Sequence, residues 1–438
     1  MTATPARPVE APATLAERQP RTLGLTDQLG LWANLGISLL IPVTATFLVA
    51  PGQSFVATAV AIAVGTAIGC TLLGLVARAG AETGAPTMVL LRGLLGRSCS
   101  YAPTALNLLQ CVGWATYEIW VISFAANAVW HGPPRWAYAL AAGAVATAMA
   151  LRPLGSVRLL KRIAVVAVVA SSAYFLVETA RHPLGDLTAG GWTGFWTSAD
   201  LVIALPVSWV PLVADYSRFS RSGRAAALGT GIGYALSSAA FFLLGVLALR
   251  AYGTGPGDDV VGALLAVPAG ALALVILAAC EVDEAFANIY STATSAQNVA
   301  PRADRRGLAL GVGAVATVLA LAVDGGAYEP FLFLIGAVFV PLAATLVVDL
   351  ALSRGAYDTS ADAPARWALL VPWVAGFAAY QLTAPTVLTA WPALEGFWRD
   401  AQDLLRISPT NGFSASLVAL AVAALLTPLA RGRRTVRR

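Results

Sequence analysis

Apolar residues fill long stretches of this chain, and short segments with polar and basic residues separate them. A helix needs about 20 mainly apolar residues to cross the roughly 30 Å of hydrocarbon in a bilayer. Stretches of this kind predict twelve transmembrane helices, at residues 26–49, 54–77, 102–128, 136–151, 163–180, 200–214, 226–249, 262–290, 308–323, 329–352, 367–385 and 413–430. The pattern therefore predicts an all-α polytopic protein that lies in a lipid bilayer.

The composition agrees with this prediction and excludes a soluble globular domain. Hydrophobic residues make up 58% of the 438 residues and charged residues only 12%. The net charge of +5 does not indicate nucleic-acid binding, because the basic residues lie in short loops and at the chain ends. The four cysteines lie in or beside apolar spans without metal-ligand spacing, so we interpret them as packing residues.

The basic residues are distributed unevenly between the two sides of the predicted bundle. With the N-terminus inside, the outer loops hold only five of the 28 Lys and Arg residues, namely Arg135, Arg181, Arg250, Arg399 and Arg406. Basic residues favour the cytoplasmic side of a membrane. We therefore predict a protein of the cytoplasmic (inner) membrane with both termini cytoplasmic. Residues 1–25 would form a disordered tail and residues 431–438 a basic tail.

Two connections between the predicted spans are longer than a turn. Residues 79–101 are expected to form a short amphipathic segment on the inner side. Residues 386–412 predict an outer amphipathic helix with Trp391 and Trp398 at the level of the lipid headgroups.

Two spans contain residues that break helices. In the sixth span, Pro206 and Pro211 each remove a backbone donor, so the helix is expected to break between them. In the first span, Gly36 and Pro42 lie on either side of Ser38 and suggest a second break. Freed backbone groups at membrane depth are tolerated only where they line a cavity or are buried in protein. Broken helices of this kind form the ion and substrate sites of secondary transporters.

The two interrupted spans lie five spans apart. This spacing predicts a five-plus-five inverted repeat, with residues 26–181 as the first repeat and residues 200–353 as the second. Two further helices at residues 367–430 would follow the repeats. In such an arrangement the third and eighth spans are partners.

The eighth span carries three carboxylates within four residues. A charged side chain at the centre of a bilayer costs roughly 3 kcal/mol on insertion scales, so such residues are rare and usually functional. On a helix Glu281, Glu284 and Asn288 share one face, whereas Ala279 and Asp283 share a nearly opposite face. We find no basic residue inside any other span to pair with them. One face is expected to meet a substrate and the other an ion.

The third span carries one polar stripe that includes an aromatic residue. Its members are Asn107, Gln110, Trp114 and Glu118. One interpretation is a hydrogen-bonded seam between helices, which is common for Asn and Gln in membranes. The other is a site for a flat heterocycle, which would stack on Trp114 and form directional hydrogen bonds with Glu118.

Four motifs of this chain resemble the nucleobase:cation symporter-1 family of purine, cytosine and hydroxymethylpyrimidine permeases. They read L-G-L-T-D-Q-L-G-L-W-A-N-L-G in the first span, Q-C-V-G-W-A-T-Y-E in the third, L-P-V-S-W-V-P-L-V-A-D-Y-S-R-F in the sixth and F-A-N-I-Y-S in the eighth. The resemblance is clearest from residue 22 to residue 306. It implies the LeuT-like inverted-repeat fold.

The resemblance implies roles for individual residues in binding substrate. Trp114 matches the tryptophan that stacks on the substrate ring, and Asn288 matches the asparagine that hydrogen-bonds to it. Glu118 stands where the family often has a glutamine. Trp209 lies near the place of a sixth-helix aromatic residue, although Pro206 occupies the expected position. Three further residues are predicted to bind substrate, namely Ser38, Ser208 and Glu284.

The resemblance also implies a sodium site. Its ligands would come from the first span at Asn34 and Ile37, and from the eighth span at Ala279, Val282 and Asp283. The family's usual pair of hydroxyl residues is replaced here by Val282 and Asp283. The predicted coupling ion is therefore Na⁺, with H⁺ as the alternative, and no organic cofactor is expected.

These observations predict a secondary transporter and not an enzyme. It would import a nucleobase-like or pyrimidine-like heterocycle by cation symport and alternating access, and it would work as a monomer. An amino-acid or amine transporter of the same fold is the main alternative, because Glu118 can pair with an ammonium group. An integral membrane enzyme is a further alternative, since clustered carboxylates can bind metals. The sequence contains no H-E-x-x-H motif, no Walker A motif and no histidine within a predicted span.

Overall fold

The computed structural model describes residues 13–14, 20–49, 52–130, 132–154, 170–252, 260–323, 325–354, 356–384, 392–408 and 412–431. Within these residues the chain is helical, and its strand-like contacts are two isolated bridges. The helices are α1 (Leu25–Leu35), α2 (Leu40–Leu48), α3 (Phe55–Thr83), α4 (Thr87–Leu95), α5 (Tyr101–Val129), α6 (Arg135–Leu151), α8 (Phe195–Ser208), α9 (Val213–Ser217), α10 (Gly223–Tyr252), α11 (Val260–Ala266), α12 (Gly270–Ala296), α13 (Arg305–Ala322), α14 (Tyr328–Ser353), α15 (Leu370–Thr383), α16 (Pro392–Leu404) and α17 (Ala415–Arg431). Residues 170–180 are also helical, and two 3₁₀ turns cover Gly325–Ala327 and Trp367–Leu369.

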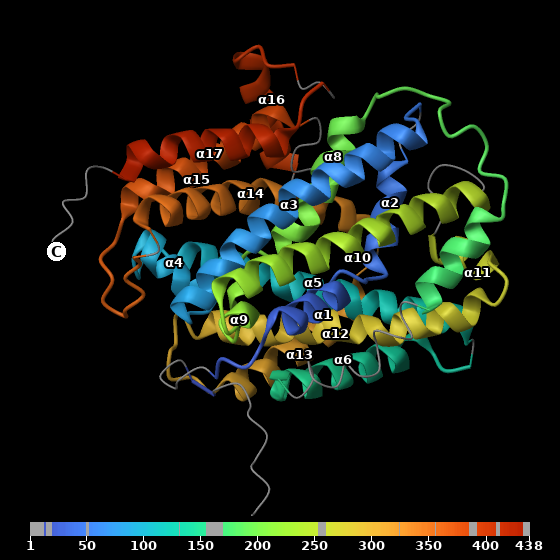
Figure 1. The fold of residues 1–438 in the computed structure, drawn as a ribbon, viewed down its shortest axis with the longest axis horizontal. Coiled ribbons are helices and arrows are strands. Elements are labelled where there is room, and N and C mark those ends of the chain that lie inside the picture. The colour runs from blue at the N-terminus through green and yellow to red at the C-terminus, as the bar shows by residue number, and fades with distance from the viewer. Residues whose placement is uncertain are drawn as a thin grey trace, which may run out of the picture.

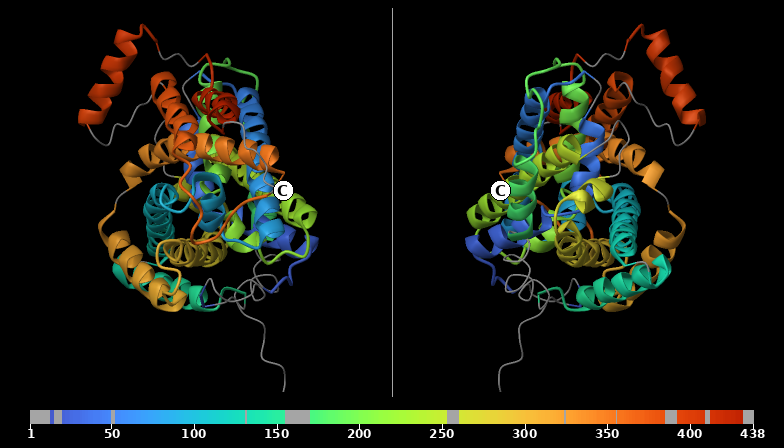
Figure 2. Two further views of the ribbon diagram at one scale, coloured as in Figure 1. Left: turned by 90° about the vertical axis from the view of Figure 1, so that its left-hand side faces the viewer. Right: turned by 90° about the vertical axis from the view of Figure 1, so that its right-hand side faces the viewer.

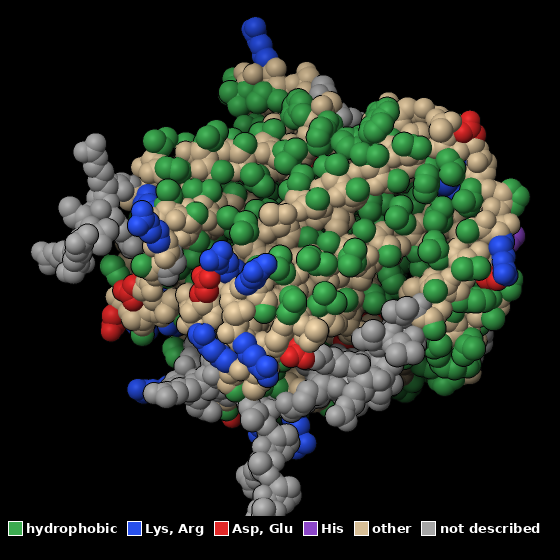
Figure 3. All heavy atoms as spheres, viewed as in Figure 1, with side chains coloured by type: hydrophobic (Ala, Val, Ile, Leu, Met, Phe, Trp, Pro, Cys, Tyr) green, Lys and Arg blue, Asp and Glu red, His purple; other side chains and the backbone are tan. Residues whose placement is uncertain are grey.

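Most helices run along the longest axis of the molecule (Figure 1), and α16 stands apart from the bundle in the side views (Figure 2). Hydrophobic side chains cover much of the face in Figure 3, and charged side chains gather toward its ends. Five described helices are long and apolar enough to cross a membrane, or six if α1 and α2 count as one bent span. Three shorter apolar helices accompany them, in Phe195–Ser208, Trp367–Thr383 and Ala415–Arg431. The number of twelve spans stays a prediction.

The eighth span differs from the single helix predicted over residues 262–290. It consists of α11 and α12, and α12 continues to Ala296. Pro268 has no backbone N–H, and Ala269 has a positive φ of 52°, so the helix is interrupted between Val267 and Gly270. The acidic residues of this span all belong to α12.

Two further predictions need correction. Residues 79–101 do not form an amphipathic surface segment, because α3 extends to Thr83 and all nine residues of α4 are buried. The N-terminal tail is shorter than predicted, since α1 begins at Leu25 and the backbone of Leu23 bonds to Phe219 and Arg221. Residues 1–12, 15–19 and 432–438 of the predicted tails lie outside the described residues, as does Trp391.

Both predicted helix breaks are present. The axes of α1 and α2 differ by 60° at a break over residues 36–39. Gly36 allows α10 to pack against this break, because a Cβ there would lie 2.2 Å from Ser237 Oγ. Pro42 falls in the first turn of α2, where a helix leaves the N–H groups without a partner. The sixth span breaks over residues 209–212, between α8 and α9.

Helices that the repeat prediction relates to one another also pack against one another. The pairs are α3 with α10, α5 with α12, and α6 with α13. They correspond to the second and seventh, third and eighth, and fourth and ninth predicted spans. A two-fold axis through the bundle brings helices near it into contact with their own counterparts, so this pairing is what an inverted repeat predicts.

A buried carboxylate of α8 connects the C-terminal helices to the bundle. Asp200 accepts hydrogen bonds from Ala415 N (2.9 Å) and Ser416 N (3.1 Å), and it also contacts the Ser414 hydroxyl. These N–H groups belong to the start of α17, which has no intrahelical acceptors for them. Asp200 therefore acts as an N-terminal cap supplied by another helix.

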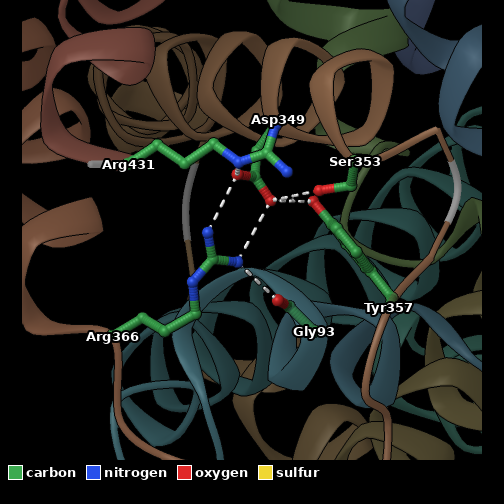
Figure 4. A network of polar contacts seen from close by, with 6 residues as sticks. All are labelled: Gly93, Asp349, Ser353, Tyr357, Arg366 and Arg431. Carbon is green, nitrogen blue, oxygen red and sulfur yellow. Dashed lines mark hydrogen bonds and ion pairs between the residues drawn. The ribbon is translucent and has the colours of Figure 1, made fainter. Parts of the chain in front are cut away.

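A second carboxylate, Asp349 of α14, holds the opposite end of α17 (Figure 4). Arg366 Nη2 donates to Asp349 Oδ1 over 3.0 Å, and Arg431 Nε lies 3.5 Å from the same oxygen. The Tyr357 hydroxyl donates to Oδ2 over 2.7 Å. Arg366 Nη1 also donates to Gly93 O of α4 over 2.8 Å, so one charge network joins α4, α14, α17 and the segment before α15.

We expect Asp349→Ala to destabilise the protein by about 3 kcal/mol, because it removes the buried partner of two mostly buried arginines. The measurement is the midpoint of thermal unfolding of the purified protein. Arg399→Ala on α16 is the control, since its ion pair with Glu395 is exposed and should contribute little. Equal midpoints for the two variants would show that the network does not stabilise the fold.

Candidate functional site

A small cavity lies where the two broken spans meet α5 and α12. About 10 Å³ of it is open to the centre of a water molecule, which is room for roughly one water. Its lining includes all seven residues predicted to bind substrate, and the full set is Ser38, Leu40, Ile41, Trp114, Glu118, Leu205, Ser208, Trp209, Tyr234, Glu284 and Asn288. The site is therefore assembled from five helices and is nearly closed in this conformation.

A second hollow is larger but less suited to recognition. It holds about 520 Å³ between α3 and α14, away from both helix breaks. Its charged residues are Arg78, Glu82 and Arg354, and Arg78 is already paired with Glu82 over 2.7 Å. The small central cavity contains the unpaired polar groups, so we treat it as the candidate site.

Aromatic rings form two walls of the cavity. Trp114 packs edge-on against Phe331 and Tyr328, with ring centroids 5.2 and 6.0 Å away. Its indole Nε1 has no hydrogen-bond partner among the described residues. On the other side, Trp209 contacts Trp32 at 5.6 Å and donates to the Tyr234 hydroxyl over 3.1 Å. Both indoles are thus held in place by other rings.

Two residues of the polar stripe on α5 bond to neighbouring helices, and the other two line the cavity. Gln110 Nε2 donates to Ser208 O over 2.9 Å, at the end of α8, and Asn107 Nδ2 donates to Ser295 Oγ over 2.8 Å. These two residues fasten α5 to its neighbours. Trp114 and Glu118, one and two turns further along, face the cavity. The seam interpretation therefore holds for Asn107 and Gln110, and binding of a heterocycle at Trp114 and Glu118 stays a prediction.

Three polar residues from α5 and α12 meet at one edge of the cavity. Asn288 Nδ2 donates to Glu118 Oε1 over 2.9 Å and lies 3.3 Å from Glu284 O. Glu118 of α5 and Glu284 of α12 both line this edge of the cavity. Glu118 Oε2 and Glu284 Oε1 have no hydrogen-bond donor among the described residues. This edge therefore presents acceptors that lack partners.

Glu281 has a different role from the one its helical face suggested. It does not line the cavity but caps α2 from across the bundle. Ser38 Oγ donates to Glu281 Oε1 and Leu39 N donates to Oε2, both over 2.7 Å. The free N–H groups that a helix break creates need an acceptor. That requirement was the available signal in the sequence, although it does not identify which carboxylate supplies the acceptor.

Asp283 also faces the broken first span. Asn34 Nδ2 donates to Asp283 Oδ2, while Asp283 Oδ1 has no donor within the described part of the chain. At the break, Ile37 N donates to Asn34 O over 3.0 Å. Of the other predicted ligands, Val282 is partly buried and Ala279 is exposed. The arrangement brings one unpaired carboxylate oxygen next to the interrupted backbone of α1.

Two tyrosines of the site carried no signal in the sequence. Tyr234 of α10 lines the cavity and accepts the indole N–H of Trp209. Tyr328 of α14 supports Trp114, and its hydroxyl lies 3.1 Å from Thr44 Oγ1 on α2. Neither residue belongs to a polar stripe or motif identified in the sequence, so only their neighbours in space reveal them.

Two interrupted helices with a nearly closed cavity between them are typical of secondary transporters. Residues 16–366 match the family described as permeases for cytosine/purines, uracil, thiamine and allantoin. The chain belongs to this family, and the prediction of a transporter rather than an enzyme is confirmed. No curated protein matches the chain in sequence.

Solved transporter structures share the fold. Mhp1, a nucleobase-cation-symport-1 family transporter, in a closed conformation with bromovinylhydantoin bound, gives a TM-score of 0.74 at 20% identity, over 97% of this chain and 94% of that chain. Inward-facing Mhp1 gives 0.70 at 19% identity, over 97% and 93%. A Na⁺-coupled sialic acid symporter gives 0.64 at 11% identity, over 96% and 93%. The predicted LeuT-like fold is therefore confirmed.

We expect Glu281→Ala to lower the unfolding midpoint, because it leaves the Ser38 hydroxyl and the Leu39 N–H without an acceptor. Each unpaired buried group costs about 1–3 kcal/mol. Glu281→Gln keeps one acceptor oxygen and should lose less. Glu329→Ala is the control, since this half-buried residue at the start of α14 has no hydrogen-bond partner in the described structure. If Glu281→Ala and Glu329→Ala unfold at the same temperature, Glu281 is not a cap.

Proposed function

We propose that this permease imports a flat nitrogen heterocycle, nucleobase-like or pyrimidine-like, by cation symport and alternating access. The observation that carries the proposal is the central cavity, which combines an indole wall with an edge of unpaired polar atoms. A flat ring needs a π-face to stack on and directional partners at its rim. Trp114 supplies the first, and Glu118, Glu284 and Asn288 supply the second.

Sodium is the proposed coupling ion, with the proton as the alternative. A hard cation prefers oxygen ligands, and the unpaired Oδ1 of Asp283 fits such an ion. Within the described residues Ile37 O accepts no hydrogen bond, so this carbonyl is also available as a ligand. When bound, the cation would link the interrupted α1 to α12. A proton on Asp283 would serve the same purpose without the carbonyl ligand.

The helix breaks support movement of the broken spans against α5 and α12. The contacts between the broken first span and α12 include two polar ones at the break, Ser38 with Glu281 and Asn34 with Asp283. The uneven distribution of basic residues supports a location in the cytoplasmic (inner) membrane with both termini in the cytoplasm. The protein would work as a monomer, since residues of a single chain form a nearly closed cavity.

A screen of ligands by thermal shift tests the proposed function, since a ligand that binds only the folded state stabilises it by mass action. Purine and pyrimidine bases and their amino derivatives should raise the unfolding midpoint. Amino acids and simple amines are the competing class. Stabilisation by amino acids alone would overturn the proposal in favour of an amino-acid transporter.

Replacement of Trp114 tests the stacking role. Trp114→Phe should bind the ligand about two- to tenfold more tightly than Trp114→Leu, because the ring face supplies roughly 0.5–1.5 kcal/mol beyond burial. Equilibrium binding of the tightest ligand from the screen to the purified variants gives the ratio. Equal affinities for Phe and Leu would show that only the volume of the side chain matters.

Replacement of Asp283 tests the coupling site. We expect Asp283→Asn to abolish uptake against a gradient in proteoliposomes while exchange of bound substrate continues. Glu329→Gln is the matched control and should still concentrate substrate. If Asp283→Asn accumulates substrate like the native protein, coupling lies elsewhere.

The identity of the ion follows from the same vesicles. With sodium coupling, substrate affinity rises with Na⁺ at fixed pH, and Na⁺ affinity rises by the same factor with substrate. With proton coupling, Na⁺ has no effect, and uptake falls as rising pH removes the proton from Asp283. We expect the sodium result.

A further inference from the structure

We propose that the transported heterocycle binds as a cation, with its charge shared between Glu118 and Glu284. This inference rests on the proposed function and specifies the chemistry of the substrate. The proposed substrate class is an aminoheterocycle whose ring nitrogen and adjacent amino group both carry hydrogen, so that the edge is an amidinium.

The centre of the protein contains buried carboxyl groups that lack partners of opposite charge among the described residues. Four carboxyl groups lie there with exposed fractions of 5% or less, in Glu118, Glu281, Asp283 and Glu284. None of the ion pairs in the described structure involves any of them. Buried charges normally have partners of opposite charge. A bound ligand or ion would therefore supply the positive charge that these carboxylates lack.

The four carboxyl groups differ in their hydrogen-bond donors and in whether they line the cavity. Glu281 receives two hydrogen bonds from Ser38 and Leu39, and Asp283 receives one from Asn34. These two carboxylates are directed at the break in the first span. Glu118 and Glu284 instead line the cavity, and each retains a buried oxygen without a donor. They are therefore the pair that a substrate can reach.

The carboxyl groups of Glu118 and Glu284 determine which chemical group of a ligand can bind between them. A carboxylate only accepts hydrogen bonds, so neither of the two can supply a donor to the other. An amidinium edge offers two donors side by side with a positive charge, one for each carboxylate, and charge-assisted hydrogen bonds are the strong ones. An oxo group in the same place would bring its oxygen, a hydrogen-bond acceptor, against the carboxylate oxygens, which are acceptors too.

The other groups around the pair do not supply a positive charge. Those on the surrounding helices are Cys111 on α5, Tyr234 on α10, Glu281 and Asp283 on α12, and Tyr328 on α14. Each is neutral or negative at neutral pH. The indole of Trp114 beside the pair favours a cation as well, because the face of an aromatic ring attracts positive charge.

Two probes with the same ring and the same substitution pattern test the inference. They are 2,4-diaminopyrimidine, which offers an amidinium edge, and uracil, which carries oxo groups at both positions. Isothermal titration of the purified protein should show that the diamino compound binds at least about tenfold more tightly. Glu284→Gln and Glu118→Gln should each weaken its binding by about tenfold or more, and should change uracil binding by less than about threefold. Glu329→Gln is the control and should change neither.

The outcomes separate this inference from the proposed function. Uracil binding as tightly as the diamino compound, or equal losses of both probes in Glu284→Gln, would overturn the inference and leave a heterocycle transporter. If neither probe nor any base of the thermal-shift screen binds, the proposed function fails and the inference with it. Should a glutamine variant not fold, the ratio of the two affinities in the native protein decides the question by itself.

Discussion

The start of α2 is buried inside the helix bundle, and its backbone N–H groups need acceptors there because bulk water does not reach them. Glu281 provides them from α12, and the other features of the site depend on this contact. It allows the first span to bend by 60°, and the bend leaves room for the central cavity beside Ser38. Asp200 meets the same requirement at α17, so helix starts capped by a carboxylate from another helix recur in this protein.

The cap also belongs to a cluster of acidic residues. The α12 carboxylate that caps α2 is accompanied by Asp283 and Glu284 within one turn, and Glu118 faces them from α5. Within the described residues none of these four buried acidic groups takes part in an ion pair, so a cation that binds from outside would supply the counter-charge. A coupling ion at Asp283 and a cationic substrate at Glu118 and Glu284 would meet this requirement in two separate places. Such an arrangement gives a physical reason for binding the two together.

The sequence predicted the helix breaks and the cavity-lining residues because single residues determine them locally. Gly36 and Pro211 lie in the two breaks, whereas Pro206 lies inside α8 two residues before its end, and the spacing of Trp114 and Glu118 places them on one face. The interruption at Pro268 was missed because apolar residues surround it on both sides.

What the sequence did not predict depends on neighbours in space. Helical periodicity gives the direction of Glu281 but not the helix that it meets, so its cap of α2 was not foreseen. The burial of α4 likewise depends on contacts with α9 and α14. Tyr234 and Tyr328 enter the site only through their partners Trp209 and Thr44.

The proposed mechanism requires that the substrate ring lies in the cavity between the two helix breaks. The most direct test is a structure with 5-bromocytosine, in which anomalous scattering locates the bromine atom. We expect one bromine site within contact distance of Trp114, with the amino edge of the ring toward Glu118 and Glu284. A bromine site in the hollow between α3 and α14, with the central cavity still closed, would contradict it.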